Sequence, residues 1–148
     1  TNTIKTRSGD LDIYTVLTSR DMRFRSGNNT VQLRVKGDNS GIQIHDIASL
    51  RAASVTSATT TTTVSSIPIG TYTAAFFDYS IKNGTNVRAG TVVATHDGTN
   101  VEFNETSTVD LGDTSDVTLS VDISSGDMRL RATTTSSTWT IKALIRGI

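Results

Sequence analysis

The sequence contains no cysteine, a single proline, a single tryptophan and only 5% aromatic residues. Without cysteine the chain has no disulfide framework, no thiolate zinc site and no cysteine nucleophile. Hydrophobic residues make up 35% of the 148 positions, whereas typical soluble domains have about 45–50%. A chain with so little apolar material has a limited core of its own, which favours burial shared between chains.

An excess of charge and a long apolar run are also missing. Lys and Arg number 14, as do Asp and Glu, so no global field attracts nucleic acid or an anionic membrane. No apolar run approaches the roughly 18 residues that span a bilayer, and no nucleotide-binding loop is present. We therefore expect no membrane insertion, no nucleic-acid partner and no cofactor. The chain opens with TNTIKT rather than Met and without a visible signal peptide, which fits either a fragment or a chain processed at its start.

Short alternating stretches separated by turn signals replace helical periodicity, and they predict an all-β fold. The first third is a ladder of short alternating segments near residues 11–14, 22–25, 31–36 and 42–45. Each segment has one apolar and one polar face, and the stretches that flank the segments, SGD, TSRD, SGNN and KGDNSG, have turn chemistry.

Two or three apolar residues per segment leave a stripe exposed to water. Repeat proteins cover such stripes by stacking, and fibres cover them by wrapping several chains around one axis. With about four segments we expect the second solution, a homotrimer. The expected trimer-interface residues are Leu11, Ile13, Met22, Phe24, Val31, Leu33, Val35, Ile42, Ile44, Ile47 and Leu50.

Three regions are expected along the chain: a shaft-like β-repeat at 1–46, a connector with the first strand at 47–66, and an antiparallel β-sandwich tip at 67–148. In DIASLRAASVTS (46–57) the spacing allows a short helix capped by Asp46 or an extended joint. The following threonine run allows a disordered linker, but its β-branched residues favour a strand.

From Gly70 onwards the pattern is a meander, since Asn-Gly and Asp-Gly between alternating stretches are strong hairpin signals. The last strands are expected to be MRLRATTT, a turn at SST, and TWTIKALIRGI. The residues expected in the core of an antiparallel sandwich or barrel share one strand face: Val117, Leu119, Val121, Ile123, Met128, Leu130, Ala132, Trp139, Ile141, Ala143 and Ile145.

The N-terminal ladder from SGDLDIYTV to GIQIHD, together with phrases such as GTNVRAGTV and STWTIKALIR, resembles the C-terminal part of tail-fibre and virion appendage proteins of tailed bacteriophages, especially aquatic ones. The resemblance covers most of the chain. It implies a homotrimer in the virion, with a fibrous shaft and a globular tip that contacts the host surface. It transfers no functional residue.

Two arginine pairs, Arg23/Arg25 in DMRFR and Arg129/Arg131 in DMRLR, are candidate ligand-binding residues. Guanidinium groups offer a planar fork of donors to anionic sugars or phosphates. The alternative is a solvated strand face with cross-strand partners such as Asp122 or Glu102, and the alternation favours that interpretation.

Histidines and carboxylates give weaker signals. His45, in the shaft, is a weak candidate for a metal held around a trimer axis, and His96 beside Asp97 lacks the context of a hydrolase. Asp110, Asp113 and Asp116 lack EF-hand spacing, so a turn with Asx hydrogen bonds is favoured over calcium.

Aromatic residues divide between core and surface. Trp139 is favoured as a core residue over a sugar-stacking one. Because Phe76 and Phe77 are adjacent on a strand, one of them is expected to pack outside the core, most simply against a neighbouring chain.

We therefore expect a non-enzymatic structural virion protein, the distal part of a trimeric tail fibre that attaches to a host by multivalent surface binding, most simply to a glycan. Its expected partners are its own copies, other virion proteins on the N-terminal side and a host-surface glycan or protein. The alternatives are a capsid or baseplate decoration protein without a receptor role and, less favoured, a glycan-degrading tailspike.

Overall fold

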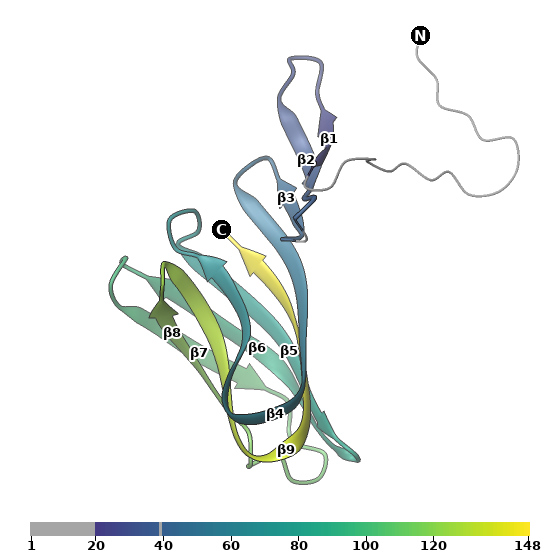
Figure 1. The fold of residues 1–148 in the computed structure, drawn as a ribbon, viewed down its shortest axis with the longest axis vertical. Helices are drawn as coiled ribbons and strands as arrows, with labels where there is room; N and C mark the ends of the chain where they lie inside the picture. The colour runs from purple at the N-terminus through teal and green to yellow at the C-terminus, as the bar shows by residue number, and fades with distance from the viewer. Residues whose placement is uncertain (1–19, 39) are drawn as a thin grey trace, which may run out of the picture.

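The computed structural model describes residues 20–38 and 40–148, which form nine β-strands and no helix (Figure 1). No helix that could cross a membrane occurs within these ranges. The all-β, antiparallel prediction is confirmed, while the first segment of the ladder, with Leu11 and Ile13, lies outside the described residues. The strands are β1 Met22–Arg25, β2 Val31–Val35, β3 Ile42–Ile44, β4 Ala48–Pro68, β5 Ala74–Asn83, β6 Asn86–His96, β7 Val101–Ser107, β8 Thr118–Ser124 and β9 Asp127–Gly147.

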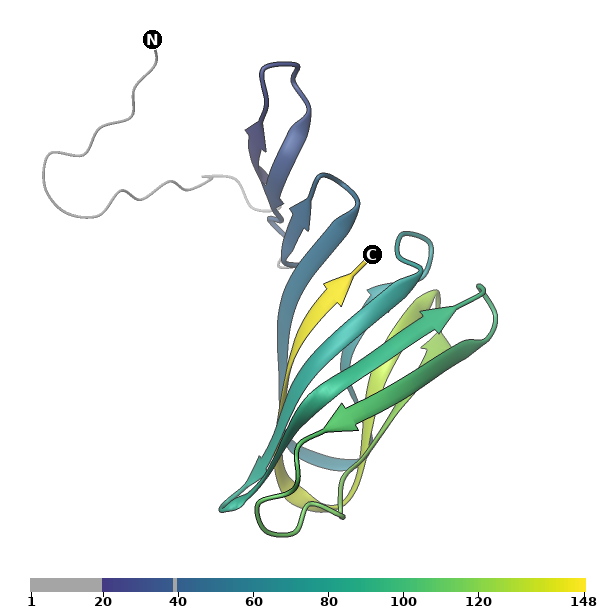
Figure 2. The ribbon, with the colours of Figure 1, turned by 180° about the vertical axis from the view of Figure 1, so that it is seen from behind.

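Two strands of 21 residues, β4 and β9, pair antiparallel along almost their whole length and bend together at one end of the molecule (Figure 1). Residues 49–56 of β4 pair with 140–147 of β9, and residues 60–68 pair with 127–134. The first layer therefore contains β1, β2, β3, the first part of β4, the last part of β9, β5, β6 and β7 (Figure 2). The second layer contains the last part of β4, the first part of β9, and β8.

The bend coincides with breaks in the strand register. The β4–β9 ladder shifts between Thr56 and Ala58, between Ala58 and Thr60, and between Thr63 and Ser65. Such bulges bend a strand and increase its twist, and Thr60 has a positive φ of 50°. The prediction of a turn at SST is wrong, since β9 continues through residues 135–138.

The core lies between the two layers. Phe77, Ile81 and Ile141 of the first layer face Met128 and Leu130 of the second, and all five are fully buried. Every member of the predicted core row is buried except Ile123, which is half-buried. Trp139 is also a core residue, as predicted, because period-two alternation commits each side chain of a strand to one face.

Residues 45–47 form a turn and residues 48–57 lie in a strand, so the alternative of a short helix capped by Asp46 is wrong. β4 begins at Ala48 and runs through the threonine run to Pro68, which confirms the strand interpretation of that run. Asp46 has a positive φ of 55° in the turn before β4 and lies 3.1 Å from Nη2 of Arg34. The expected connector at 47–66 thus coincides with most of β4.

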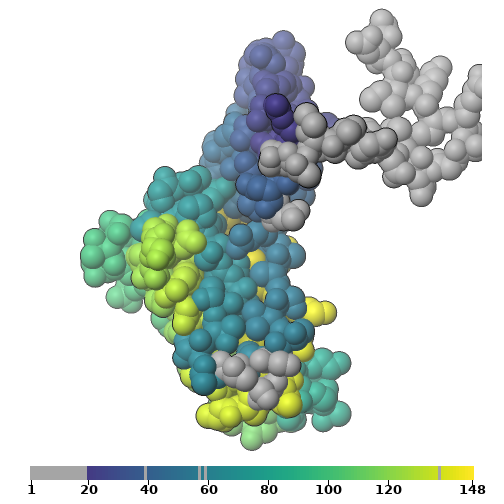
Figure 3. All heavy atoms as spheres, viewed as in Figure 1, coloured from purple at the N-terminus to yellow at the C-terminus, as the bar shows by residue number. Residues whose placement is uncertain are grey.

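The three short strands β1 to β3 form an antiparallel meander that adds to the edge of β4. We call residues 20–50, as far as the structure describes them, the arm. Figure 3 shows the first part of the arm, in purple, projecting at one end of the molecule. The alternating segments predicted near 22–25, 31–36 and 42–45 are strands at 22–25, 31–35 and 42–44.

Candidate functional site

One side of the arm is polar and organised around Asp21. Its carboxylate accepts a hydrogen bond of 3.2 Å from the backbone N–H of Gly37 and lies 3.3, 3.5 and 3.7 Å from Arg23, Arg34 and Lys36. The Gly37 hydrogen bond, with Arg23 and Lys36 close by, lowers the pKa of Asp21. The charges of the arm are therefore concentrated on one face.

The opposite side of the arm is apolar and has no second layer over it among the described residues. Directly paired residues share a face of a sheet, which places Phe24, Leu33 and Ile44 in one cross-strand row. Phe24 is 47% exposed and Ile44 is 50% exposed, so the described residues cover little of this face; Ile47, in the turn before β4, is 67% exposed. None of the predicted interface residues that the structure describes belongs to the buried core.

A neighbouring row continues this apolar face onto the sandwich. The row crosses seven strands through successive pairs and contains Met22, Val35, Ile42, Leu50, Arg146, Phe76 and Val93. Its one charged member, Arg146, pairs with Asp78 at 3.2 Å and lies 4.8 Å above the ring of Phe76. Phe77 faces the core, so the predicted division of the two phenylalanines is confirmed.

The two arginine pairs lie on different elements and make separate contacts. Arg129 binds Asp122 through two hydrogen bonds of 2.7 Å, which confirms Asp122 as its expected cross-strand partner. Arg131 donates to Thr63 at 2.6 Å. In the arm, Arg23 contacts Asp21, and Arg25 holds the β1–β2 turn by donating to the carbonyl of Asn29 at 2.9 Å. A ligand-binding role for these arginines stays a prediction.

His45, the weak metal candidate, is not part of a cluster of metal ligands among the described residues. His45 is exposed in the β3–β4 turn, and residues 20–38 and 40–148 hold no group of three His, Cys, Asp or Glu side chains suited to a metal. Asp113 accepts from the backbone N–H of Ser115 at 2.9 Å, the predicted Asx turn, while Asp110 accepts from Thr114. His96 contacts the carbonyl of Tyr72 through Nε2 at 2.7 Å.

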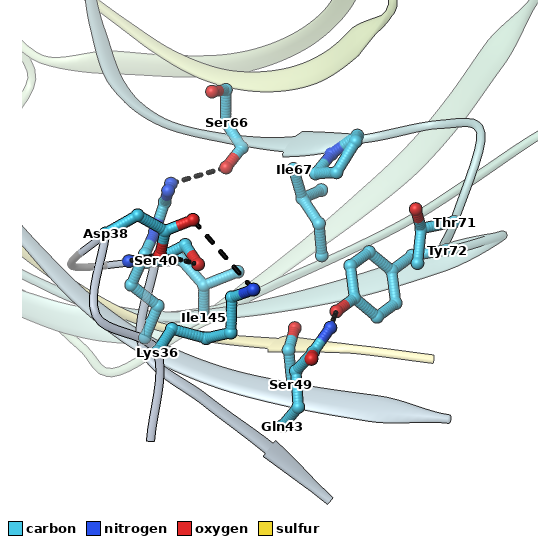
Figure 4. A pocket seen from close by; sticks show the side chains of 12 residues that line it. Lys36, Asp38, Ser40, Gln43, Ser49, Ser66, Ile67, Thr71, Tyr72 and Ile145 are labelled. Carbon is cyan, nitrogen blue, oxygen red and sulfur yellow. Dashed lines mark hydrogen bonds and ion pairs between the residues drawn. The ribbon is translucent and has the colours of Figure 1, made fainter. Parts of the chain in front are cut away.

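A cleft of about 260 Å³ lies where the polar side of the arm meets the open end of the sandwich (Figure 4). Both ends of β4 line it, because the bend brings Ser49 and Arg51 opposite Ser66 and Ile67. The arm contributes Lys36, Asp38, Ser40 and Gln43, and the segment after β4 contributes Thr71 and Tyr72.

Arg51 joins the two halves of β4 across the cleft. Its Nη2 donates to the hydroxyl of Ser65 at 2.8 Å and to the carbonyl of Ser66. Gln43 donates from Nε2 to the phenol oxygen of Tyr72 at 3.4 Å, which connects the arm to the sandwich on the other side of the cleft. These contacts fix the shape of the cleft.

No pattern in the sequence predicts this cleft. Its residues come from four separate segments of the chain and match no binding motif, and KGDNSG is explained by turn chemistry alone. Ser49 and Ser66 lie near each other only because β4 bends, and the sequence does not predict that bend.

Comparisons with known proteins show little similarity. No protein-family model and no curated protein matches the chain. Among solved structures, one described as "Crystal structure of Acinetobacter baumannii phage AM24 tailspike protein" is similar with a TM-score of 0.41 and 10% identity. The match covers 71% of this chain and 27% of that one, so the chain spans about a quarter of its length. Overlap at this level carries no argument about function.

Proposed function

We propose that the chain is a non-enzymatic structural protein of a phage tail, the distal part of a homotrimeric fibre that attaches to the host surface. The proposal rests on the sequence resemblance described above and on one structural observation, the uncovered apolar face of the arm. Phe24, Val35 and Ile44 are between 40% and 50% exposed on that face, where residues 20–38 and 40–148 of one chain leave them in contact with water.

Identical copies suit this face because it is almost free of charge. The arm keeps its ionic side chains on the other side, and Arg146, the charged member of the row, is balanced by Asp78 within the chain. Two or three copies that meet through such a surface bring no unbalanced like charges together. The neighbouring copy would cover the apolar stripe.

A structural role also fits the contacts of the polar residues. Asp122, Asp116 and His96 each hold a neighbouring strand or loop through hydrogen bonds. These contacts give each of the three side chains a structural role, so we infer that they support the fold rather than acid–base chemistry.

Three measurements test the proposal. Native mass spectrometry of the chain should give a trimer at micromolar concentration, and a monomer would refute the fibre arrangement. Fluorescently labelled protein should bind to cells in a panel of bacteria, and a trimer that binds none of them would favour the decoration role. Shortened chains after incubation with host polysaccharide would favour the tailspike instead.

A further inference from the structure

The cleft between the arm and the sandwich contains more hydrogen-bond donors than its own acceptors use. The ammonium group of Lys36 has three donors, and the nearest carboxylates among the described residues, those of Asp21 and Asp38, lie 3.7 and 4.0 Å away. Both distances exceed a normal N–H···O hydrogen bond. Arg51 uses a single nitrogen, Nη2, for both of its contacts with β4. An acceptor-rich ligand would satisfy this excess.

Among the described residues one carboxylate, that of Asp38, lines the cleft, and it is already engaged. Oδ1 of Asp38 accepts from the backbone N–H of Ser40 at 3.0 Å and from its hydroxyl at 2.6 Å. The hydrogen bonds from Ser40, with the charge of Lys36 nearby, lower the pKa of Asp38, so it stays ionised. With Lys36 and Arg51 against Asp38, the lining carries one positive charge more than negative, in a chain whose net charge is zero.

The floor of the cleft is apolar. Ile67, Ile145 and the ring of Tyr72 are buried side chains that line it, and Pro68 lies at its edge. Figure 4 shows Ile67 and the Tyr72 ring on one side and Lys36 and Asp38 on the other. Small-molecule sites combine such apolar walls with a few placed polar groups, and this volume is close to the lower end of their range, about 300 Å³.

We propose that this cleft binds a single sugar residue that carries a carboxylate, as in an acidic polysaccharide. The C–H face of the ring would pack on Ile67 and Tyr72, its hydroxyls would meet Ser49 and the Tyr72 phenol, and its carboxylate would meet Lys36. The inference deepens the attachment role proposed above and rests on it. It assigns ligand binding to residues of the cleft instead of to the two arginine pairs.

The probes are D-glucuronate and D-glucose, which differ only at C6, with acetate as a carboxylate without a ring. The full chain, labelled with ¹⁵N, is titrated with each and followed by amide chemical shifts. Glucuronate should move the signals of cleft residues and should bind at least about tenfold more tightly than glucose, because charge-assisted hydrogen bonds are about twice as strong as neutral ones. Acetate should bind more weakly than glucuronate.

Three variants identify the site. Lys36→Met keeps the aliphatic stem and removes the ammonium, so glucuronate affinity should fall to that of glucose while glucose binding is unchanged. Tyr72→Phe should weaken both sugars, and Ser49→Ala serves in its place if that variant fails to fold. Lys142→Met, on the exposed face of β9 outside the cleft, should change neither.

Equal affinity for the two sugars, shifts outside the cleft, or full glucuronate affinity in Lys36→Met would each overturn the proposal. A separate assay, binding of the labelled chain to bacterial cells, distinguishes failure of the cleft proposal from failure of the attachment role. A chain that binds cells but neither sugar removes the cleft proposal alone. A chain that binds glucuronate in the cleft but no cells supports the cleft and removes the attachment role.

Discussion

Trp139 donates a hydrogen bond of 2.6 Å from its indole Nε1 to Oδ2 of Asp116. The same carboxylate accepts from the backbone N–H of Thr135 at 3.0 Å, from the Thr135 hydroxyl, and from Ser136 at 2.8 Å. Four donors on one carboxylate fasten the segment before β8 to the part of β9 that passes between the layers. These hydrogen bonds, led by the two hydroxyls, hold the pKa of Asp116 far below its usual range.

Asp116→Asn is expected to lower the melting temperature at neutral pH. It should also reduce the fall in melting temperature that acid causes. A carboxyl whose pKa is depressed in the folded chain stabilises that chain above the unfolded pKa of about 3.9, and the contribution is lost as the pH falls below it. Thermal unfolding at neutral pH and at about pH 3 measures both effects. Trp139→Phe removes one donor and should keep most of the acid sensitivity. Equal acid-induced losses in wild type and Asp116→Asn would contradict the assignment.

Phe76 and Phe77 offer a matched pair of substitutions on opposite faces of β5. Phe77→Ala should reduce the free energy of unfolding by about 3–5 kcal/mol, because the ring is completely buried. Phe76→Ala removes a partly exposed ring and the contact with Arg146, which is worth about 0.5–1 kcal/mol. Urea unfolding at several protein concentrations checks this, and only the loss in Phe76→Ala should depend on concentration. Similar losses in both variants would contradict the assignment of faces.

The alternation of residues was sufficient to predict the core row from Val117 to Ile145. Each strand there has one buried and one polar face, and glycines after Asn83 and Ser125 mark the turns, so local sequence and final position agree. The opposed faces of Phe76 and Phe77 followed from the same rule. For these strands the local pattern determines the tertiary position.

The bend of β4 and β9 could not be predicted in the same way. A run of threonines has the same local sequence pattern in a regular strand as in a strand with bulges. The bulges near Thr60 depend on the pairing register with a strand some 70 residues away. The cleft depends on that bend. Its residues are therefore visible only once the two halves of β4 are placed in different layers.

Substitution of Gly126 in the β8–β9 hairpin should lower the stability of the chain. Its φ of 83° lies in the left-handed region, and an added Cβ would meet nothing within 4 Å, so the cost of a side chain is conformational. Gly126→Ala should destabilise the chain by about 1–2 kcal/mol. Gly70→Ala, where space is also open but φ is not positive, is the control and should be near neutral. Chemical denaturation compares them, and an equal effect in the two would rule out backbone strain as the cause.

Tyr79 should ionise late in an alkaline titration. Burial, together with a hydrogen bond to Glu105 and its charge, raises the pKa of Tyr79 to about 12. The resulting stabilisation is complete below the unfolded pKa of about 10 and is lost as the pH rises through about 12. The difference between the ultraviolet titrations of wild type and Tyr79→Phe isolates this phenol. A difference step centred near pH 10 would show that it is solvated.

The final prediction separates the two faces of the arm. Ile44→Glu places a carboxylate in the apolar row with Phe24 and Leu33, whereas Gln32→Glu places the same charge on the other face of the arm. If sibling chains cover the row, Ile44→Glu should raise the dissociation constant of the oligomer at least about tenfold, since burying one such side chain contributes about 1.5–3 kcal/mol. Gln32→Glu should leave the mass of the assembly unchanged. Light scattering after size-exclusion chromatography reports both masses over a dilution series, and an Ile44→Glu chain that keeps the wild-type mass at every concentration would place the contact between copies elsewhere.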